Sequence, residues 1–260
     1  MIALLLAASV SCPRMLQVDP KEWKEALLKA APGSKEQGQL LEQLGFRPVP
    51  AGGAVPDAEC AEEPVVRGVD LLPASVTGGK DLVVHVRFEL CADEAESHFW
   101  SQRIAVLKPL RGGAYCKLGG EDPSIDAPAS DVCGGPDRPP RLLKLVRLTS
   151  RRRDTLELQD RIDECPGPVH TSVESVSFLD ARGDRLVQAF EVKTREASSE
   201  APEEPAQLVE RTVKPDGGGF PRKLVVTEET SCPEGEPGGS CRPGRRATVY
   251  VLAGGKYVAR

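Results

Sequence analysis

The chain has few of the residues on which enzymes and nucleic-acid-binding proteins rely. It contains three histidines, no asparagine and only 4% aromatic residues, and its net charge is −5. Without asparagine there is no acceptor for N-glycosylation. The shortage of histidine limits the choice of general bases, and the negative charge disfavours nucleic-acid binding, which needs a basic domain or stripe. The scarcity of aromatic residues requires a core built mainly from Val, Leu and Ala.

Familiar catalytic and metal-binding motifs are absent as well. The sequence has no Gly-x-Ser-x-Gly, no His-Glu-x-x-His, no phosphate-binding glycine loop, no EF-hand loop and no Cys-x-x-Cys pair. We therefore expect no metal and no cofactor. The sequence favours a non-enzymatic binding or structural protein. A hydrolase that uses carboxylates and an enzyme inhibitor that presents a loop remain alternatives.

The N-terminus carries the strongest signal in the chain. A short apolar run at residues 2–8 precedes Ser9-Val10-Ser11-Cys12, and no later stretch approaches the roughly 20 apolar residues of a transmembrane helix. This pattern resembles the signal of bacterial lipoproteins, in which the cysteine after small residues is lipidated. The resemblance implies export to the cell envelope or secretion, and a membrane anchor through lipid at Cys12. An ordinary cleaved signal and a cytosolic N-terminal segment are the alternatives.

The eight cysteines agree with export, because disulfides persist in oxidising compartments. Cys232 and Cys241 flank a Pro- and Gly-rich loop, and a bridge there would contribute roughly 2–3 kcal/mol through loop closure. Cys116 and Cys133 flank a similar loop and form our second predicted pair. A lipidated Cys12 would leave an odd number of cysteines for pairing.

The sequence after the leader at residues 1–12 divides into three parts. Residues 13–47 predict a helical hairpin: Asp19 and Ser34 are typical helix N-caps, and apolar residues follow each at helical spacing. Residues 48–64 have no periodicity and indicate a linker to a domain at 65–260. The partner of that domain, an envelope protein or a ligand, is unknown from the sequence.

Residues 65–260 predict an antiparallel β domain. Alternation of apolar and polar residues is clear at 82–90, and about ten such short segments follow one another with Gly-, Pro- and Asp-containing turns. We expect hairpins at 142–162, 172–193 and 247–259. The pattern is typical of a sandwich, a barrel or a propeller-like array. The closing residues, from Gly219 to Val258, resemble the hairpins of exported bacterial β-repeat proteins.

The segment 82–90 also supplies a candidate binding cluster. His85, Arg87 and Glu89 alternate with apolar residues and therefore lie on one face of the predicted strand. Such a cluster has the charges to bind an anion or polarise a substrate. A solvated outer face of the sheet explains the three residues as well, and we favour it.

A second candidate lies at His98, Phe99 and Trp100, after an acidic run. Exposed aromatic residues on a loop are suited to grip a ligand or an envelope protein. A cover over one end of the core is the other interpretation. If the protein has a ligand surface, we expect it on the loops around these residues and at 112–140. Arg151-Arg152-Arg153 offers a third contact, with phosphate or lipid headgroups, although its place between two strands favours a solvated turn.

Overall fold

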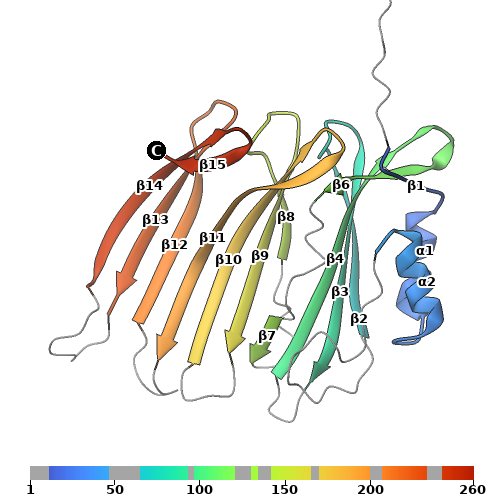
Figure 1. Ribbon diagram of the computed structural model, residues 1–260, viewed down its shortest axis with the longest axis horizontal. Helices are drawn as coiled ribbons and strands as arrows, with labels where there is room; N and C mark the ends of the chain where they lie inside the picture. Colours follow the sequence, from blue (N-terminus) through green and yellow to red (C-terminus); the bar gives the residue numbers. More distant parts are fainter. Residues whose placement is uncertain are drawn as a thin grey trace, which may run out of the picture.

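The computed structural model describes residues 12–46, 65–92, 97–120, 130–133, 142–164, 170–199, 207–232 and 242–260. Within these residues the chain forms two short helices followed by antiparallel β-sheet (Figure 1). The predicted mainly β fold with an N-terminal helical hairpin is therefore confirmed. Most of the predicted leader and the predicted linker lie outside the described residues.

The two helices, α1 (Pro20–Lys29) and α2 (Lys35–Gln43), begin at the predicted caps. The carboxylate of Asp19 accepts hydrogen bonds from two backbone amides in the first turn of α1, at 2.8 and 3.2 Å. The hydroxyl of Ser34 accepts one from the first turn of α2 at 3.1 Å. These side chains satisfy amides that have no partner inside the helix, which is why each helix starts at these residues.

The first sheet, sheet A, has the strand order β1-β5-β4-β3-β2, with β7 also paired to β4. All of its pairs are antiparallel. Its strands are β1 (Arg14–Leu16), β2 (Val65–Ala74), β3 (Asp81–Ala92), β4 (Ser97–Pro109), β5 (Tyr115–Lys117) and β7 (Ser130–Cys133).

The second sheet, sheet B, runs β15-β14-β13-β12-β11-β10-β9-β8, so strands adjacent in sequence are adjacent in space. The short strand β6 joins it by pairing in parallel with β11. β15 pairs only with residues 250–253 of β14. Its strands are β6 (Gly119–Gly120), β8 (Leu142–Val146), β9 (Thr155–Glu164), β10 (His170–Arg182), β11 (Arg185–Ser199), β12 (Gln207–Asp216), β13 (Lys223–Ser231), β14 (Gly244–Ala253) and β15 (Lys256–Ala259).

The predicted hairpins are confirmed in their order and pairing. β8 pairs with β9, β10 with β11 and β14 with β15. At the β10–β11 turn, Gly183 has a φ of 62°. Glycine adopts this conformation without steric cost, which explains why the Asp-Ala-Arg-Gly-Asp sequence reverses the chain there.

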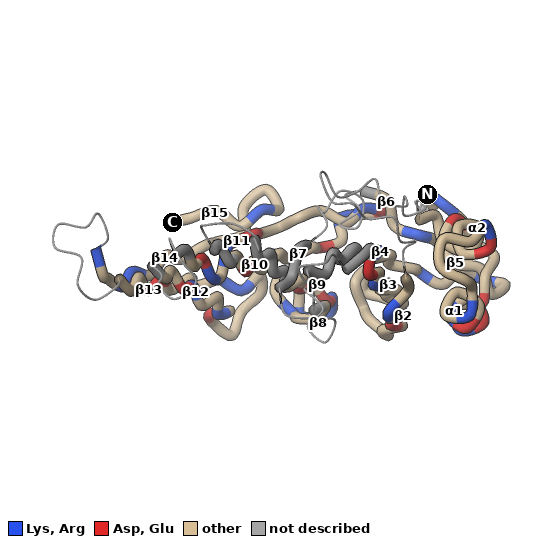
Figure 2. Tube along the Cα trace, turned by 90° about the horizontal axis from the view of Figure 1, so that it is seen from below, with Lys and Arg blue, Asp and Glu red and all other residues tan. Residues whose placement is uncertain are grey.

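Sheet A is buried on both faces. Alternate residues of β3, among them Val84 and Phe88, pack against the apolar sides of α1 and α2. The opposite face carries Val83, which packs in a second cluster with Leu156 and Leu179 of sheet B. The two sheets therefore pack face to face over part of sheet B, as in a sandwich, while the other strands of sheet B extend beyond (Figure 2). The assembly is not a closed barrel.

A third apolar cluster fills the concave side of sheet B. It joins strands β10, β11 and β13 to β15 and includes the aromatic rings of Phe178, Phe190 and Tyr257. The first cluster holds the other buried aromatic residues, Trp23, Phe46 and Phe88. Val, Leu and Ala supply most of the other two clusters, as the composition predicts.

Six hairpin turns lie at one end of the strands, which we call the turn end. They are residues 75–80, 110–114, 147–154, 183–184, 217–222 and 254–255. Turns that are distant in the sequence are joined there by hydrogen bonds. The amide of Ser75 donates to Asp154 at 2.7 Å, and the amide of Arg222 donates to the carbonyl of Leu148 at 2.8 Å. Sheet B therefore curls at this end.

The sequence analysis missed four short strands, β1, β5, β6 and β7, which have no partner in a predicted hairpin. Each has only two to four residues, which is too short to show a repeating pattern. Three of them fall in the region 112–140 that we predicted as loop. That prediction is therefore wrong for β5, β6 and β7, although residues 121–129 and 134–140 lie outside the described part of the chain.

Candidate functional site

The predicted trio on β3 does lie on one face, but that face is not solvated. His85 is 2% exposed and Glu89 is 5% exposed. Both point away from the helices, on the side of sheet A that packs against sheet B. The prediction of a solvated outer face is therefore wrong for these two residues, because a second sheet covers the face that the alternation identifies as polar.

His85 stands between two oxygen atoms from neighbouring strands. Its Nε2 lies 2.9 Å from Oε1 of Gln102 on β4, and its Nδ1 lies 3.7 Å from Oδ2 of Asp70 on β2. Arg87 approaches the same Asp70 oxygen at 3.3 Å. The interaction with His85, and then the charge of Arg87, hold the pKa of Asp70 below its ordinary value. We call these four residues the polar cluster.

The polar cluster does not have the features of a hydrolytic carboxylate pair. A general acid needs a raised pKa so that it keeps its proton at neutral pH, whereas the pKa of Asp70 is lowered. Glu89 forms an ion pair with Arg67. Both carboxylates are thus held by cations, and structural ion pairs between β2 and β3 of sheet A account for them.

The second predicted group, His98 to Trp100, lies in a strand and not on a loop. All three residues belong to β4. His98 is paired in register with Ala92 and with Val132, and Trp100 with Glu89 and Ser130. The prediction that they sit on a loop is wrong, and their side chains lie outside what the structure describes.

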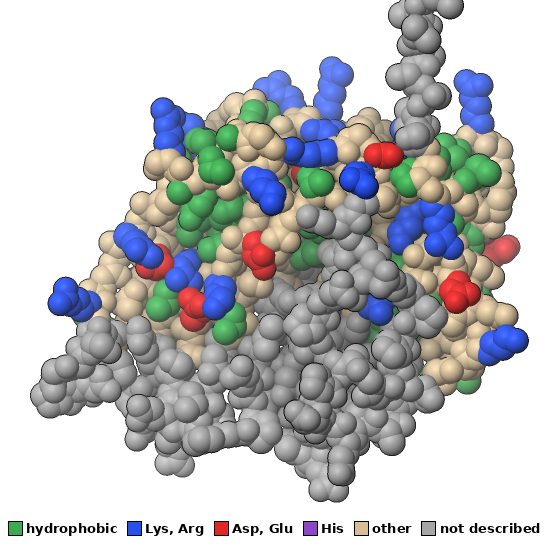
Figure 3. Space-filling model, in the orientation of Figure 1, with side chains coloured by type: hydrophobic (Ala, Val, Ile, Leu, Met, Phe, Trp, Pro, Cys, Tyr) green, Lys and Arg blue, Asp and Glu red, His purple; other side chains and the backbone are tan. Residues whose placement is uncertain are grey.

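The structure contains a pocket that the sequence analysis missed. It has a volume of about 390 Å³ and lies between β11 and the β14–β15 hairpin. Figure 3 shows hydrophobic side chains gathered over the upper part of these strands. Its lining residues are Gln188, Ala189, Phe190, Glu191, Tyr250, Lys256 and Tyr257.

Three aromatic rings form the base of this aromatic pocket. Phe190 meets Tyr250 edge to face with ring centroids 5.0 Å apart, and Tyr257 at 6.0 Å. The hydroxyl of Tyr257 donates to the carbonyl of Arg222 at 3.0 Å. Burial, with the charge of Asp180, raises the pKa of Tyr257 to about 12. The hydroxyl therefore keeps its proton and fixes the ring in place.

The rim of the aromatic pocket is polar and carries both signs of charge. Lys256 and Glu191 are exposed, and Gln188 is half-buried between them and the base. Nε2 of Gln188 donates to Oε2 of Glu191 at 2.6 Å. The pocket thus offers apolar ring surface below and hydrogen-bonding groups above, without a dominant charge.

The sequence signal for this pocket was weak. Tyr250 and Tyr257 belong to the closing hairpin, whose alternation we did predict, and their spacing across a tight turn places them close together. Phe190 lies on a strand about 60 residues earlier. A β-bulge between Phe178 and Leu179 shifts its register, which alternation alone does not reveal.

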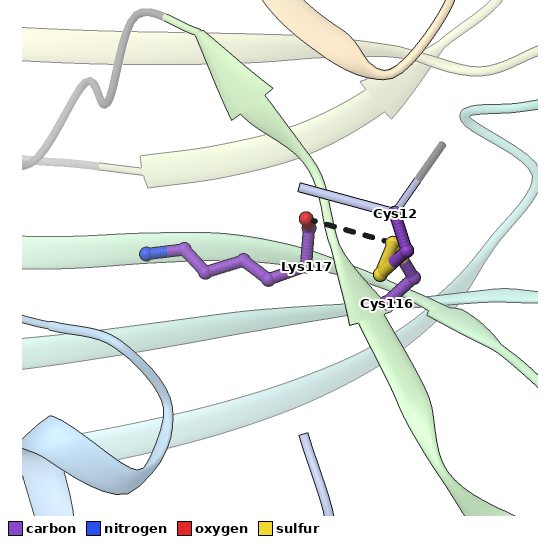
Figure 4. Close-up of a disulfide and its surroundings, with 3 residues drawn as sticks. All are labelled: Cys12, Cys116 and Lys117. Atoms are coloured by element: carbon purple, nitrogen blue, oxygen red, sulfur yellow. Dashed lines mark hydrogen bonds between the residues drawn. A yellow bond between two sulfur atoms is a disulfide. The ribbon is translucent and has the colours of Figure 1, made fainter. Parts of the chain in front are cut away.

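Cys12 is joined to Cys116 by a disulfide that crosses a separation of 104 residues (Figure 4). The predicted pairing of Cys116 with Cys133 is therefore wrong. β5, which carries Cys116, pairs with β1 beside Cys12, whereas β7, which carries Cys133, pairs with a distant part of β4. Cys232 is disulfide-bonded, as predicted, but Cys241 lies outside the described residues.

Neither metal binding nor a known relative gives an independent indication of function. Among the described residues no group of His, Cys, Asp or Glu is arranged to hold a metal ion. No helix in that part of the chain has the length and apolar character to cross a membrane. The chain matches no known protein family, no curated protein and no solved structure.

Proposed function

We propose that this chain is an exported protein of the bacterial cell envelope that binds a small ligand in the aromatic pocket and has no enzymatic role. The aromatic pocket is the observation that carries the proposal. Ligand sites are typically concave and mostly apolar, with a few polar groups that fix orientation, and a volume of about 390 Å³ is within their range.

The composition of the pocket favours an uncharged ring with one apolar face, such as a sugar unit of an envelope glycan. The exposed face of Tyr250 offers a flat surface for the apolar side of such a ring. Gln188, Glu191 and Lys256 are placed at the rim to bond its hydroxyl groups. Because Lys256 and Glu191 carry opposite charges, neither an anion nor a cation is favoured.

The disulfides support export, because such bonds persist outside the reducing cytosol. They also restrict how Cys12 can be used. One sulfur atom cannot both bond to Cys116 and carry a lipid. Lipid attachment at Cys12, which the N-terminal signal favours, and the Cys12–Cys116 disulfide are thus alternative forms of the exported protein.

Saturation-transfer NMR with uncharged sugars, such as glucose and N-acetylglucosamine, tests the pocket. We expect transfer to the ring protons, weakened at least about tenfold by Lys256→Ala or Gln188→Ala because the rim bonds are lost. Lys214→Ala, at an exposed residue of β12 outside the pocket, is the matched control. Equal transfer in all variants, or none with any sugar, would contradict the proposed ligand site.

Intact mass spectrometry of the native protein, with and without reduction, tests export. We expect a mature N-terminus at or before Cys12. The mass should show either an added lipid or the loss of two hydrogen atoms for the Cys12–Cys116 disulfide. An unprocessed chain with all of its thiols reduced would contradict export and leave the pocket experiment unaffected.

A further inference from the structure

The turn end is rich in basic residues. The six turns of the turn end contain seven Lys and Arg residues and two Asp residues. The chain as a whole is acidic, so the basic character of the turn end does not reflect its average composition.

The cations of the turn end are accessible. Lys80, Arg111, Arg151, Arg152 and Arg185 are all exposed. The first four come from three turns, and Arg185 is the first residue of β11, directly after a fourth turn. Figure 3 shows Lys and Arg side chains along the upper edge of the molecule with few acidic ones between them. The basic groups therefore form a row that spans both sheets.

The turns that carry these cations are held to one another. Asp154 accepts a hydrogen bond from the amide of Ser75, which fixes the Arg151–Arg153 turn of sheet B against a turn of sheet A. Arg182 donates to the carbonyl of Gly254 at 2.8 Å and fixes two further turns. Because the turns are already fixed, the cations can bind an extended surface without the entropy cost of ordering each turn separately.

Cys12, the first residue that the structure describes, lies at this same end. Cys12 is bonded to Cys116. Three residues further along, the amide of Gly119 donates to the carbonyl of Asp184 in the β10–β11 turn at 2.8 Å. The apolar residues 2–8 precede Cys12 by only a few positions. Because Arg14 pairs with Lys117, a lipid on Cys12 would lie beside the basic row also without the disulfide.

We infer that the turn end is a membrane-facing surface that binds the headgroups of anionic lipids. Stable attachment to a membrane usually needs two signals, such as one apolar chain and a group of basic residues. The basic residues lie at the turn end, and the N-terminal signal predicts the apolar chain, as a lipid on Cys12. The inference rests on the proposed export to the envelope and does not involve the aromatic pocket.

Vesicle sedimentation of the full chain tests this surface. We expect at least about tenfold stronger binding to phosphatidylcholine vesicles with about 30% phosphatidylglycerol than to phosphatidylcholine alone. The preference should fall when salt rises from about 0.05 to 0.5 M, because salt screens the headgroup charges. The triple variant Arg151→Glu, Arg152→Glu, Arg185→Glu should lose it.

The triple variant Lys21→Glu, Lys29→Glu, Lys35→Glu is the matched control, since it reverses three exposed charges on the helical hairpin. It should keep most of the preference. Equal binding to both vesicles, or equal loss in both triple variants, would overturn the inference. Binding to heparin without binding to anionic vesicles would also overturn it, and would identify a soluble polyanion as the ligand of the row.

Sugar binding measured on the same turn-end variant separates the two proposals. If the pocket binds sugar and the vesicle preference is absent, only the membrane surface is wrong. If the vesicle preference is present and no sugar binds, only the ligand site is wrong.

Discussion

At the scale of single residues, the turn end depends on one glycine that no other residue can replace. Gly255 has a φ of 90°, in the left-handed region that favours glycine. The guanidinium group of Arg182 lies over it, at the position that a Cβ atom would occupy. Gly255 thus lets the β14–β15 hairpin approach the β10–β11 turn closely enough for Arg182 to bond to Gly254.

The substitution Gly255→Ala should lower the free energy of unfolding by about 2 kcal/mol or more, because it adds backbone strain and displaces Arg182. Urea titration followed by circular dichroism measures the change. Gly218→Ala is the control, since a Cβ at Gly218 meets no atom within 4 Å. We expect the control to stay within about 0.5 kcal/mol. Equal effects of the two substitutions would contradict the proposed role of Gly255.

The polar cluster makes a second prediction at this scale, on pH. The pKa of Asp70 is lowered in the folded protein by His85 and Arg87, so its carboxylate stabilises the fold above its ordinary pKa. That contribution is lost as the pH falls through the lower, folded value. Asp70→Asn should therefore destabilise the protein at neutral pH, and its stability should converge with that of the wild type as the pH falls below the ordinary pKa of an aspartate.

Denaturant titrations at a series of pH values would measure this convergence. Asp216→Asn removes a carboxylate from an exposed position at the end of β12 and serves as the control. A constant difference between wild type and Asp70→Asn across the whole pH range would show that the substitution acts through packing and not through the charge.

At the scale of elements, the sequence predicted what is local. Helix caps at Asp19 and Ser34, and hairpins closed by short turns, were identified because their signals lie within a few residues. The burial of His85 was missed, because alternation shows which residues share a face and not what covers that face. The aromatic pocket was missed for the same reason, since Phe190 and Tyr250 come from strands far apart in the chain.

The Cys12–Cys116 disulfide joins two elements that the sequence did not pair. It closes a loop of more than 100 residues, which should stabilise the fold by about 4 kcal/mol if the bond acts on the entropy of the unfolded chain. The double variant Cys12→Ser, Cys116→Ser should show this loss in denaturant titration. Added reductant should then destabilise the wild type more than the double variant. A similar response of both to reductant would place the main effect in another disulfide.

At the scale of the whole molecule, the second apolar cluster makes the two sheets depend on each other. Leu156 of sheet B is fully buried and packs in one cluster with Val83 and Ile104 of sheet A. Neither sheet can unfold at this contact without exposing the apolar face of the other. We therefore expect one cooperative transition for the described part of the chain.

Leu156→Ala should lower the free energy of unfolding by about 3 kcal/mol through the cavity that it leaves. Tryptophan fluorescence, which includes Trp23 against sheet A, and circular dichroism should still give coincident transitions. Leu28→Ala is the control, because Leu28 is 47% exposed and its truncation should have little effect. Two separate transitions in the wild type would show that the sheets unfold independently.

The short pairing of β15 with β14 affects how molecules of this protein associate with one another. Since β15 accompanies only residues 250–253 of β14, the first half of β14 offers backbone groups to an incoming strand. That half begins with Gly244-Arg245-Arg246, and both arginines are exposed. A strand added there by another molecule would have to lie beside these charged side chains and remove water from them. Charged side chains on an edge strand thus oppose end-to-end addition of further molecules.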